Sequence, residues 1–220
     1  MNNRFRKLFA VEKPIIGMIH LAGNSLEEKI NRALSELKIY QEEGVNGAII
    51  EDYHANGQEL IDSLKEISKR QWDIKLGINY LRNPDSVFAL AQDYGASFIQ
   101  LDSVQGLGFR YAEQKSRFPN LIVLGGVRFK YQPLTGRTLE EDVEQGRYRC
   151  DAIVTTGEGT GIETPIKKLR QFKEVLKDFP LIIGAGVNLS NVYDQLQMLQ
   201  LLEVILSLME IHNSLLIVYE

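Results

Sequence analysis

The 220-residue sequence contains a single cysteine, Cys150, which excludes an internal disulfide and a cysteine-based metal cluster. Cys150 directly precedes an apolar run, a position that favours a small buried residue over a nucleophile. The chain also lacks a basic surplus, because 25 Lys and Arg residues face 29 Asp and Glu residues, giving a net charge of −4. Proteins that bind nucleic acid usually carry excess positive charge, so the composition argues against that class.

Long uninterrupted hydrophobic runs are also missing. The amino-terminal stretch has basic residues but an apolar run of only four residues, which is too short for a signal peptide. The apolar segment near the end of the chain is interrupted by Glu203, Glu210, His212 and Asn213, which argues against a membrane span. A cytoplasmic protein is therefore the expectation.

Several catalytic motifs are absent from the sequence: HExxH, a nucleophile elbow, CxxC and the Gly-Lys-Ser/Thr ending of a P-loop. No linker rich in Pro, Gly or Ser and no low-complexity tract divides the chain. With 44% hydrophobic and 25% charged residues, the chain can bury a full core. We expect one domain over residues 1–220, with residues 199–220 as an atypical carboxyl-terminal segment.

A repeating strand-then-helix pattern is present, and residues 151–187 show it most completely. DAIVTT is an apolar run typical of a strand buried on both faces, and it ends at the glycine-rich GEGTG. Thr164 and Pro165 predict the N-cap and first position of a helix whose apolar stripe runs to Phe179 and which ends at Pro180. LIIGAGV then begins the next strand. Two buried strands joined by a helix of this length are expected to be parallel.

The same pattern recurs along the chain, with strands expected to begin at residues 15, 47, 74, 98, 121, 151 and 181. Ser25 with Glu28, and Thr138 with Glu141, predict capping boxes at two of the helices between them. The stretch 105–120 is the weakest helix candidate, and a seventh helix is expected from about Ser190 to Leu199. With LEVILSL as one more apolar run, the pattern predicts an α/β fold, a (β/α)8 TIM barrel with an atypical or incomplete eighth unit.

Polar residues stand at the carboxyl ends of the expected strands, which converge on one mouth in such a barrel. His20, Glu51, Asp102 and Lys130 are the predicted catalytic residues. Each also has a structural interpretation: a rim histidine, a turn-capping aspartate or a solvated lysine. Strand alternation sends Glu51 and Asp52 to opposite faces, and we expect Glu51 to point inward. The expected substrate-binding residues are Asn79, Arg128, Thr155, Thr156, Gly157, Gly159, Gly184 and Gly186.

Two details qualify this set of candidates. Arg128 and Lys130 are two residues apart and share a strand face, so either both enter the mouth or both lie on the loop. GEGTG offers backbone N–H groups and space for a phosphate, but Glu158 and Glu163 oppose a phosphate at close range. The glycine-rich stretch is therefore expected to form at most half of a phosphate site.

Five segments carry a family resemblance: KPIIGMIHLAG, GVNGAIIEDY, LGINYLRNPDSVFALAQDYGASFIQLDS, DAIVTTGEGTG and PLIIGAGVNLSNV. Over about residues 13–198 the chain resembles the BtpA/SgcQ family, which is grouped with the ribulose-phosphate-binding barrels. The resemblance implies the barrel and places His20, Glu51, Asn79, Arg82, Asn83 and Lys130 on family-like positions. Arg82 and Asn83 thereby join the substrate-binding candidates. One founding member is associated with photosystem I biogenesis, and others resemble enzymes of sugar metabolism.

The sequence departs from the family pattern in two places. GGVRFKYQ replaces a fifth strand that usually carries Asp and His near the lysine. After about Met198, the family's eighth strand of the type ADGxIVGS, whose Gly-Ser end helps bind phosphate, is replaced by LQLLEVILSLMEIHNSLLIVYE. Three interpretations of this tail are open. It forms a divergent eighth strand at LEVILSL, which we favour, a long helix that closes the bottom of the barrel, or a truncated or frame-altered terminus.

The leading functional hypothesis is an enzyme of the lyase, isomerase or hydrolase type that acts on a small phosphorylated metabolite, such as a sugar phosphate. Glu51 or Asp102 would be the general base, His20 the proton shuttle, and Lys130 an electrophile or phosphate ligand. A divalent metal held by Glu51, His20 and Asp102 is an alternative. The rival hypotheses are a non-catalytic assembly or regulatory factor, as in photosystem biogenesis, and a remnant without activity. Barrels of this kind often pair, so a homo-oligomer is compatible with the sequence.

Overall fold

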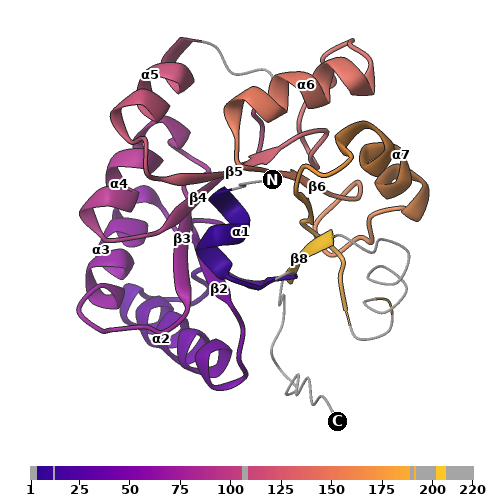
Figure 1. Ribbon diagram of the computed structural model, residues 1–220. Coiled ribbons are helices and arrows are strands. Elements are labelled where there is room, and N and C mark those ends of the chain that lie inside the picture. The colour runs from indigo at the N-terminus through magenta and orange to yellow at the C-terminus, as the bar shows by residue number, and fades with distance from the viewer. Residues whose placement is uncertain (1–3, 12, 106–108, 189–190, 192–201, 207–220) are drawn as a thin grey trace.

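The computed structural model describes residues 4–11, 13–105, 109–188, 191 and 202–206. Eight parallel strands form a closed barrel in sequence order (Figure 1). They are β1 (Ile15–Ile19), β2 (Gly47–Glu51), β3 (Lys75–Asn79), β4 (Phe98–Leu101), β5 (Ile122–Gly126), β6 (Ala152–Thr155), β7 (Leu181–Ile183) and β8 (Leu202–Leu206). β8 pairs with both β7 and β1, so the predicted eighth strand is confirmed and closes the sheet.

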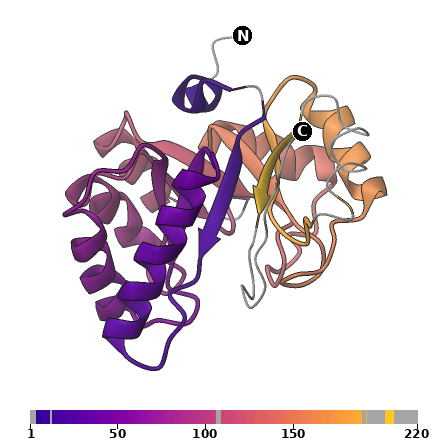
Figure 2. The ribbon, with the colours of Figure 1, turned by 90° about the horizontal axis from the view of Figure 1, so that it is seen from below.

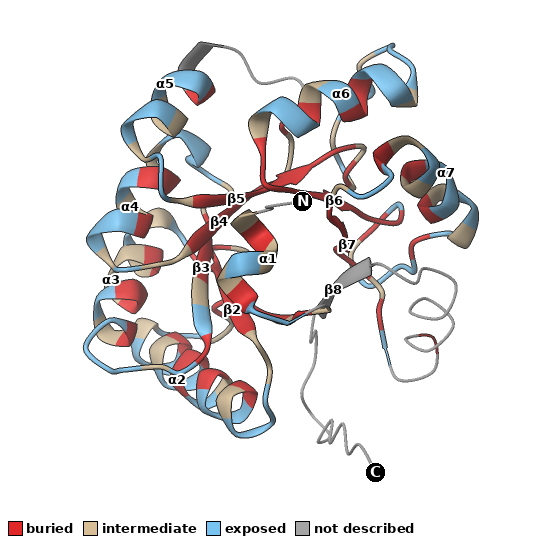
Figure 3. Ribbon diagram, in the orientation of Figure 1, coloured by how far each residue is buried: buried red, intermediate tan, exposed pale blue. Residues whose placement is uncertain are grey.

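Helices lie on the outside of the barrel (Figure 1). They are α2 (Leu26–Glu42), α3 (Gly57–Ile67), α4 (Val87–Asp93) after the short 3-10 helix η1 (Pro84–Ser86), α5 (Phe109–Arg117), α6 (Leu139–Arg149) and α7 (Ile166–Leu176). The outer faces of these helices are exposed, while β2 and β4 to β7 are buried, as Figure 3 shows. The predicted (β/α)8 architecture is confirmed, and the weak helix candidate forms α5. The helix expected from Ser190 lies outside the described residues. No described helix is long and apolar enough to cross a membrane.

Strand alternation divides the buried side chains into two layers. One set fills the barrel interior and includes Ile16, Met18, Ile49, Phe98 and Val154. The other set packs between the sheet and the helices and includes the alternate strand residues, such as Ile50 and Ile153. Both faces of β1 and of β4 to β7 are therefore largely apolar, which explains why these strands read as continuous hydrophobic runs.

An additional helix, α1 (Arg4–Phe9), closes the end of the barrel at which the strands begin (Figure 2). Phe5 and Phe9 are four residues apart on one helix face and are both buried in the interior layer. The ring of Phe9 contacts Phe98 of β4, with 5.6 Å between ring centroids. The sequence analysis assigned no element here, because six residues are too few for helical periodicity to be recognised.

Two glycines allow large rings to fill the space around the sheet. A Cβ on Gly77 would lie 2.3 Å from the ring of Phe98, and a Cβ on Gly17 would lie 2.3 Å from the ring of Tyr40.

Cys150 is buried, as expected, and burial raises the pKa of its thiol to about 12. That thiol is protonated at neutral pH, which fits the structural interpretation.

The helix ends agree only partly with the predicted caps. Thr138 and Glu141 form the expected capping box. Ser25 accepts from the N–H of Glu28, but the Glu28 carboxylate accepts from the N–H of Asn24. The prediction for Thr164 is wrong, because Pro165 occupies the N-cap position of α7 and no side chain caps that helix.

The predicted end of α7 is wrong too. The helix ends at Leu176, and Lys177 adopts a left-handed φ of 56°, so Phe179 packs on the core from outside the helix. The sequence suggested that the helix ends at Pro180. Instead, the left-handed conformation of Lys177 turns the chain three positions earlier.

Candidate active site

The strand-tip residues surround a cavity at the carboxyl end of the barrel. It has a volume of about 130 Å³ and is lined by Met18, His20, Glu51, Tyr53, Leu81, Gln100, Asp102, Phe129, Lys130, Tyr131, Gln132 and Gly184. All four residues predicted to be catalytic are in this set. They come from the ends of β1, β2 and β4 and from the segment that follows β5. We refer to this place as the mouth.

One amide joins the two carboxyl groups at the mouth. Asn79, the last residue of β3, donates from Nδ2 to Oε2 of Glu51 at 2.9 Å and to Oδ1 of Asp102 at 3.0 Å. Gln100, two residues before Asp102 and on the same strand face, donates from Nε2 to Asp102 at 3.2 Å. A carboxamide nitrogen carries two N–H groups, so Asn79 uses both of them to hold the carboxyl groups close together.

Burial changes the acidity of both carboxyl groups. Loss of hydration, and then the nearby charge of Asp102, raise the pKa of Glu51 to about 8, although Lys130 and Asn79 act in the opposite direction. Burial also raises the pKa of Asp102. Glu51 therefore carries a proton at pH 7, and the pair can both give and accept a proton near neutral pH.

His20 follows β1 and lies beside Glu51. Burial, with a further effect from the charge of Lys130, lowers its pKa to about 4. Its Nε2 is 4.0 Å from Oε1 of Glu51. Because both groups are uncharged at pH 7, this contact is not an ion pair, and it is too long for a direct hydrogen bond. The imidazole packs against Tyr53 with 5.2 Å between ring centroids.

Lys130 brings a positive charge to the same cavity. Its backbone N–H donates to Oγ1 of Thr156 at 2.7 Å, and its ammonium group lies 5.7 Å from the ring centre of Phe129. Its charge lowers the pKa of Glu51 and of His20. The mouth therefore combines a proton-exchanging carboxyl pair with a cation that can attract a negative oxygen.

Arg128 and Lys130 both lie on the loop that follows β5, which is one of the two predicted arrangements, but their side chains have different surroundings. β5 ends at Gly126 and Arg128 has a φ of 48°, so strand alternation no longer applies. The Nε of Arg128 donates to Asp142 of α6 at 3.1 Å, and one Nη donates to the carbonyl of Arg137 at 3.0 Å. The Arg128 side chain is therefore bound to α6 and to the segment that precedes α6, while Lys130 lines the mouth.

Lys168 was not predicted as a site residue, but it links two segments beside Lys130. From α7, its Nζ donates to the carbonyl of Arg128 at 2.7 Å and to that of Thr156 at 2.6 Å. Burial lowers the pKa of its ammonium group to about 8. No sequence signal separated Lys168 from the other lysines of this helix. Gln100 could have been found, because it stands two residues before Asp102 on the same strand face.

Asp52 and Arg82 support the loop next to the mouth. Asp52 points away from Glu51, as alternation predicts, and accepts from the N–H groups of Leu81 at 2.6 Å and Arg82 at 3.3 Å. The Arg82 guanidinium contacts the Asp52 carboxylate at 3.1 Å and also donates to its backbone carbonyl. Asn83 is exposed at the start of η1. Arg82 and Asn83 are not among the residues that line the cavity.

The glycine-rich segment packs closely against the end of β7. A Cβ on Gly157 would lie 2.6 Å from two carbonyl oxygens, and Gly186 has a φ of 70° with a backbone nitrogen 2.4 Å from where its Cβ would be. Side chains at these positions would force the backbone to move. A Cβ on Gly159 would meet Ile162 at 2.9 Å, and one on Gly184 would meet Val154 at 2.7 Å.

The threonines at the end of β6 have different surroundings. Thr156 accepts the Lys130 bond described above and donates from its hydroxyl to the carbonyl of Gly157 at 2.9 Å. Thr155 is fully buried, and its hydroxyl has no partner among the described residues. Of the two, Thr156 is the one that contacts the segment carrying Lys130.

A divalent metal does not fit the described side chains. Among the described residues, no group of three His, Cys, Asp or Glu side chains is arranged to hold an ion. Asn79 occupies one oxygen of Glu51 and one of Asp102, and the pKa values of both carboxyl groups are raised. The two carboxyl groups are therefore engaged with the Asn79 amide in this arrangement.

Comparison with known proteins identifies relatives over most of the chain. A model of the BtpA family matches residues 11–114. An uncharacterised protein of Pyrococcus abyssi is 32% identical over 214 residues, which cover 82% of this chain and 81% of that protein. The photosystem I biogenesis protein BtpA of a Synechocystis species is 24% identical over 227 residues, covering 86% of this chain and 78% of that protein.

Solved structures show the same fold. Phosphoribosyl anthranilate isomerase of Thermus thermophilus superposes with a TM-score of 0.61 at 14% identity, covering 88% of this chain and 86% of that one. At this level of identity the match supports the TIM-barrel architecture and carries no information on substrate or residue roles.

Proposed function

This chain belongs to the BtpA family, and we propose that it is an enzyme that binds a small phosphorylated metabolite at the mouth of its barrel. The observation that carries the proposal is the carboxyl pair of Glu51 and Asp102, buried on the amide of Asn79 in the same cavity as Lys130. Buried carboxyl groups with strongly shifted pKa values are typical of functional sites. A purely structural role would not require a second carboxyl group and a cation at the same mouth.

The reaction that fits these groups is proton transfer at a carbon next to a carbonyl, as in an isomerisation. Asp102, as the carboxylate, takes the proton from carbon, and the protonated Glu51 donates its proton to the carbonyl oxygen. Lys130 stabilises the negative charge that develops on that oxygen, and the product of this step is a neutral enediol. His20, which is neutral at pH 7, relays a proton through one water molecule. Glu51, now a carboxylate, then removes the proton from the hydroxyl group of the neighbouring carbon, while Asp102 returns its proton to the former carbonyl carbon. This gives the isomeric carbonyl compound and restores both carboxyl groups without a redox cofactor.

The size of the cavity limits which part of the ligand enters it. A volume of about 130 Å³ is below the range usual for whole metabolites, so only the reacting carbons and their oxygens fit. The phosphate would then extend toward Gly157, Gly159, Gly184 and Gly186, with Thr155 and Thr156 beside them. Since Glu158 and Glu163 oppose close binding there, Lys130 supplies part of the attraction for the phosphate.

Ligand-induced thermal stabilisation tests this proposal. Ribose 5-phosphate at a hundredfold excess over its Kd should raise the melting temperature by roughly 5–10 °C, and unphosphorylated ribose should not. The Lys130→Ala and Asp102→Asn variants should lose most of the shift, while Lys167→Ala, which alters an exposed residue of α7, should keep it. An equal shift in all variants would place the ligand elsewhere.

A second candidate function is a non-catalytic role in assembly. It is favoured by the name of the Synechocystis relative, a photosystem I biogenesis protein. Such a role would not use the carboxyl pair. If a panel of triose, tetrose, pentose and hexose phosphates leaves the melting temperature unchanged, the assembly role becomes the better account.

A further inference from the structure

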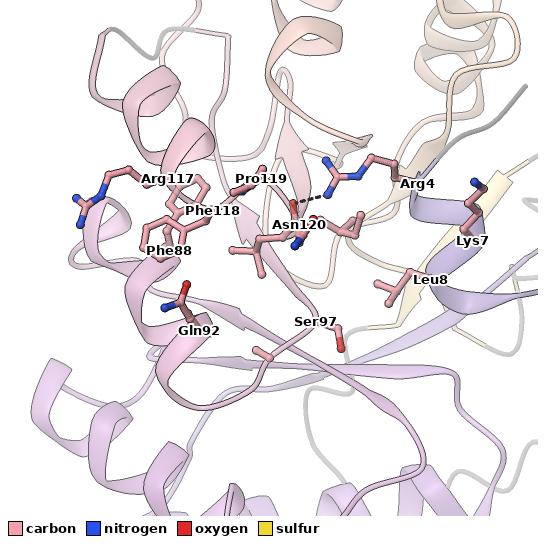
Figure 4. A pocket seen from close by; sticks show the side chains of 13 residues that line it. Arg4, Lys7, Leu8, Phe88, Gln92, Ser97, Arg117, Phe118, Pro119 and Asn120 are labelled. Carbon is pink, nitrogen blue, oxygen red and sulfur yellow. Dashed lines mark hydrogen bonds between the residues drawn. The ribbon is translucent and has the colours of Figure 1, made fainter.

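A second and larger groove lies at the opposite end of the barrel from the mouth. Its volume is about 780 Å³, and it runs between α1, α4 and the turn that joins α5 to β5 (Figure 4). We call it the amino-end groove. The two faces of α1 explain its position, because Phe5 and Phe9 enter the barrel while Arg4, Lys7 and Leu8 remain outside and line the groove.

Every ionisable side chain that lines the amino-end groove is positively charged. These residues are Arg4, Lys7 and Arg117, and no Asp or Glu is among the lining residues, although acids outnumber bases in the chain as a whole. Arg4 is held in place by the Leu121 carbonyl at 3.3 Å and by Asp151 at 3.6 Å. Lys7 and Arg117 form no ion pair with a described carboxylate. The groove therefore favours a negatively charged occupant.

The remaining lining residues suit a polypeptide. Leu8, Phe118 and Leu121 supply apolar contacts, and Phe118 packs on the buried Phe88 with 6.0 Å between ring centroids. The carboxamides of Gln92 and Asn120 are exposed and have no hydrogen-bond partner among the described residues. A carboxamide offers one acceptor and two donors, which match the C=O and N–H groups of an extended peptide backbone.

We propose that the amino-end groove binds a peptide segment of a partner protein that carries both acidic and apolar side chains. The charged side chains of the segment pair with Lys7 and Arg117, its apolar side chains cover Leu8 and Phe118, and its backbone bonds to Gln92 and Asn120. A free small anion would leave the apolar surface in contact with water. The inference is independent of the chemistry at the mouth, because the groove residues and the mouth residues do not overlap.

Selection from a random octapeptide display library against the full chain tests this inference. We expect enrichment of peptides that combine Asp or Glu with Leu or Phe. The synthetic form of an enriched peptide should bind the Lys7→Glu/Arg117→Glu variant at least tenfold more weakly. Both substitutions are at exposed positions, so folding should be retained, which a melting curve verifies. The matched control Lys38→Glu, at an exposed site on α2, should bind within twofold of the wild type.

Several outcomes would overturn the inference. Enrichment of neutral or basic peptides, or no enrichment at all, would contradict the proposal that the partner segment is acidic. Equal binding by the charge-reversed variant would place the peptide elsewhere. Self-association in sedimentation that the charge reversal abolishes would identify a second copy as the occupant. Displacement of the peptide by inorganic phosphate at low millimolar concentration would identify a small-anion site.

Discussion

Asn79 determines the arrangement of the polar groups at the mouth. Its two N–H groups are committed to Glu51 and Asp102, which fixes the distance between two acids that would otherwise repel each other when charged. Glu51 holds a proton at neutral pH because burial and the charge of Asp102 both disfavour its charged form, although the hydrogen bond from Asn79 acts in the opposite direction. Asn79 is not among the residues that line the cavity, yet it positions the two carboxyl groups that are proposed to act on the substrate.

The raised pKa of Glu51 predicts how stability depends on pH. Between pH 6.5 and 8 the folded protein keeps a proton on Glu51 that the unfolded chain, with a value near 4.5, has already lost. The contribution of Glu51 to the free energy of unfolding should therefore fall by about 1.5 kcal/mol over this window as the pH rises, while His20 and Lys168, whose pKa values are lowered, act in the opposite direction. Urea unfolding at both pH values measures it, and Glu51→Gln should remove this part of the dependence. An identical dependence in wild type and variant would contradict the assignment.

His20 sets the lower limit of that pH window. Its pKa is lowered from 6.5 to about 4, so between these values the unfolded chain binds a proton that the folded chain does not. This effect makes stability rise with pH up to about 6.5, in the opposite direction to Glu51. At pH 6.5 the unfolded His20 is still half protonated, so about 0.4 kcal/mol of its contribution remains and is reached by about pH 7.5. The Glu51→Gln comparison separates the Glu51 contribution from it.

Some side-chain positions at the mouth could be predicted from the sequence, and others could not. Alternation placed Glu51 inward and Asp52 outward, because both lie at a regular strand end. It failed for Arg128, since β5 ends at Gly126 and the left-handed φ that follows depends on contacts with Asp142 and Gln105. Lys168 was missed because its partners are two backbone carbonyls, which carry no side-chain signal.

At the scale of elements, the short helix α1 has two structural roles. Six residues place two phenylalanine rings in the barrel interior and create one wall of the amino-end groove. The strands and most outer helices were predictable because they have an apolar run or stripe, whereas α5 was the weakest helix candidate. α1 was not predictable, and neither was the Pro165 start of α7, because both depend on tertiary packing more than on local pattern.

The closing role of α1 predicts a large stability loss when its core side chain is truncated. Phe5 is fully buried, so Phe5→Ala should lower the free energy of unfolding by about 3–5 kcal/mol. The neighbouring Lys7→Ala, at an exposed position, should change it by less than about 0.5 kcal/mol. Urea denaturation measures both. A loss below about 1 kcal/mol for Phe5→Ala would mean that α1 contributes little to the barrel.

The molecule as a whole has two chemically different ends. The carboxyl end gathers Glu51, Asp102, His20 and Lys130 around a small cavity, whereas the amino end has a wide groove with only positive charges. The architecture was predictable from the steady strand–helix repeat, and so was the end that carries the acids. The amino-end groove was not, because it is built from residues of α1, α4 and the α5–β5 turn that no sequence pattern connects.

The most direct test of the central claim is solvent-deuterium incorporation into a carbonyl-containing sugar phosphate, followed by NMR in D2O at pH 7. The account predicts that ribose 5-phosphate, or the phosphosugar from the panel that stabilises the protein most, gains deuterium at the carbon next to its carbonyl. The rate should fall at least a hundredfold in Asp102→Asn and stay unchanged in the control Lys167→Ala. A phosphosugar that binds at the mouth yet exchanges no faster than in buffer alone would contradict it.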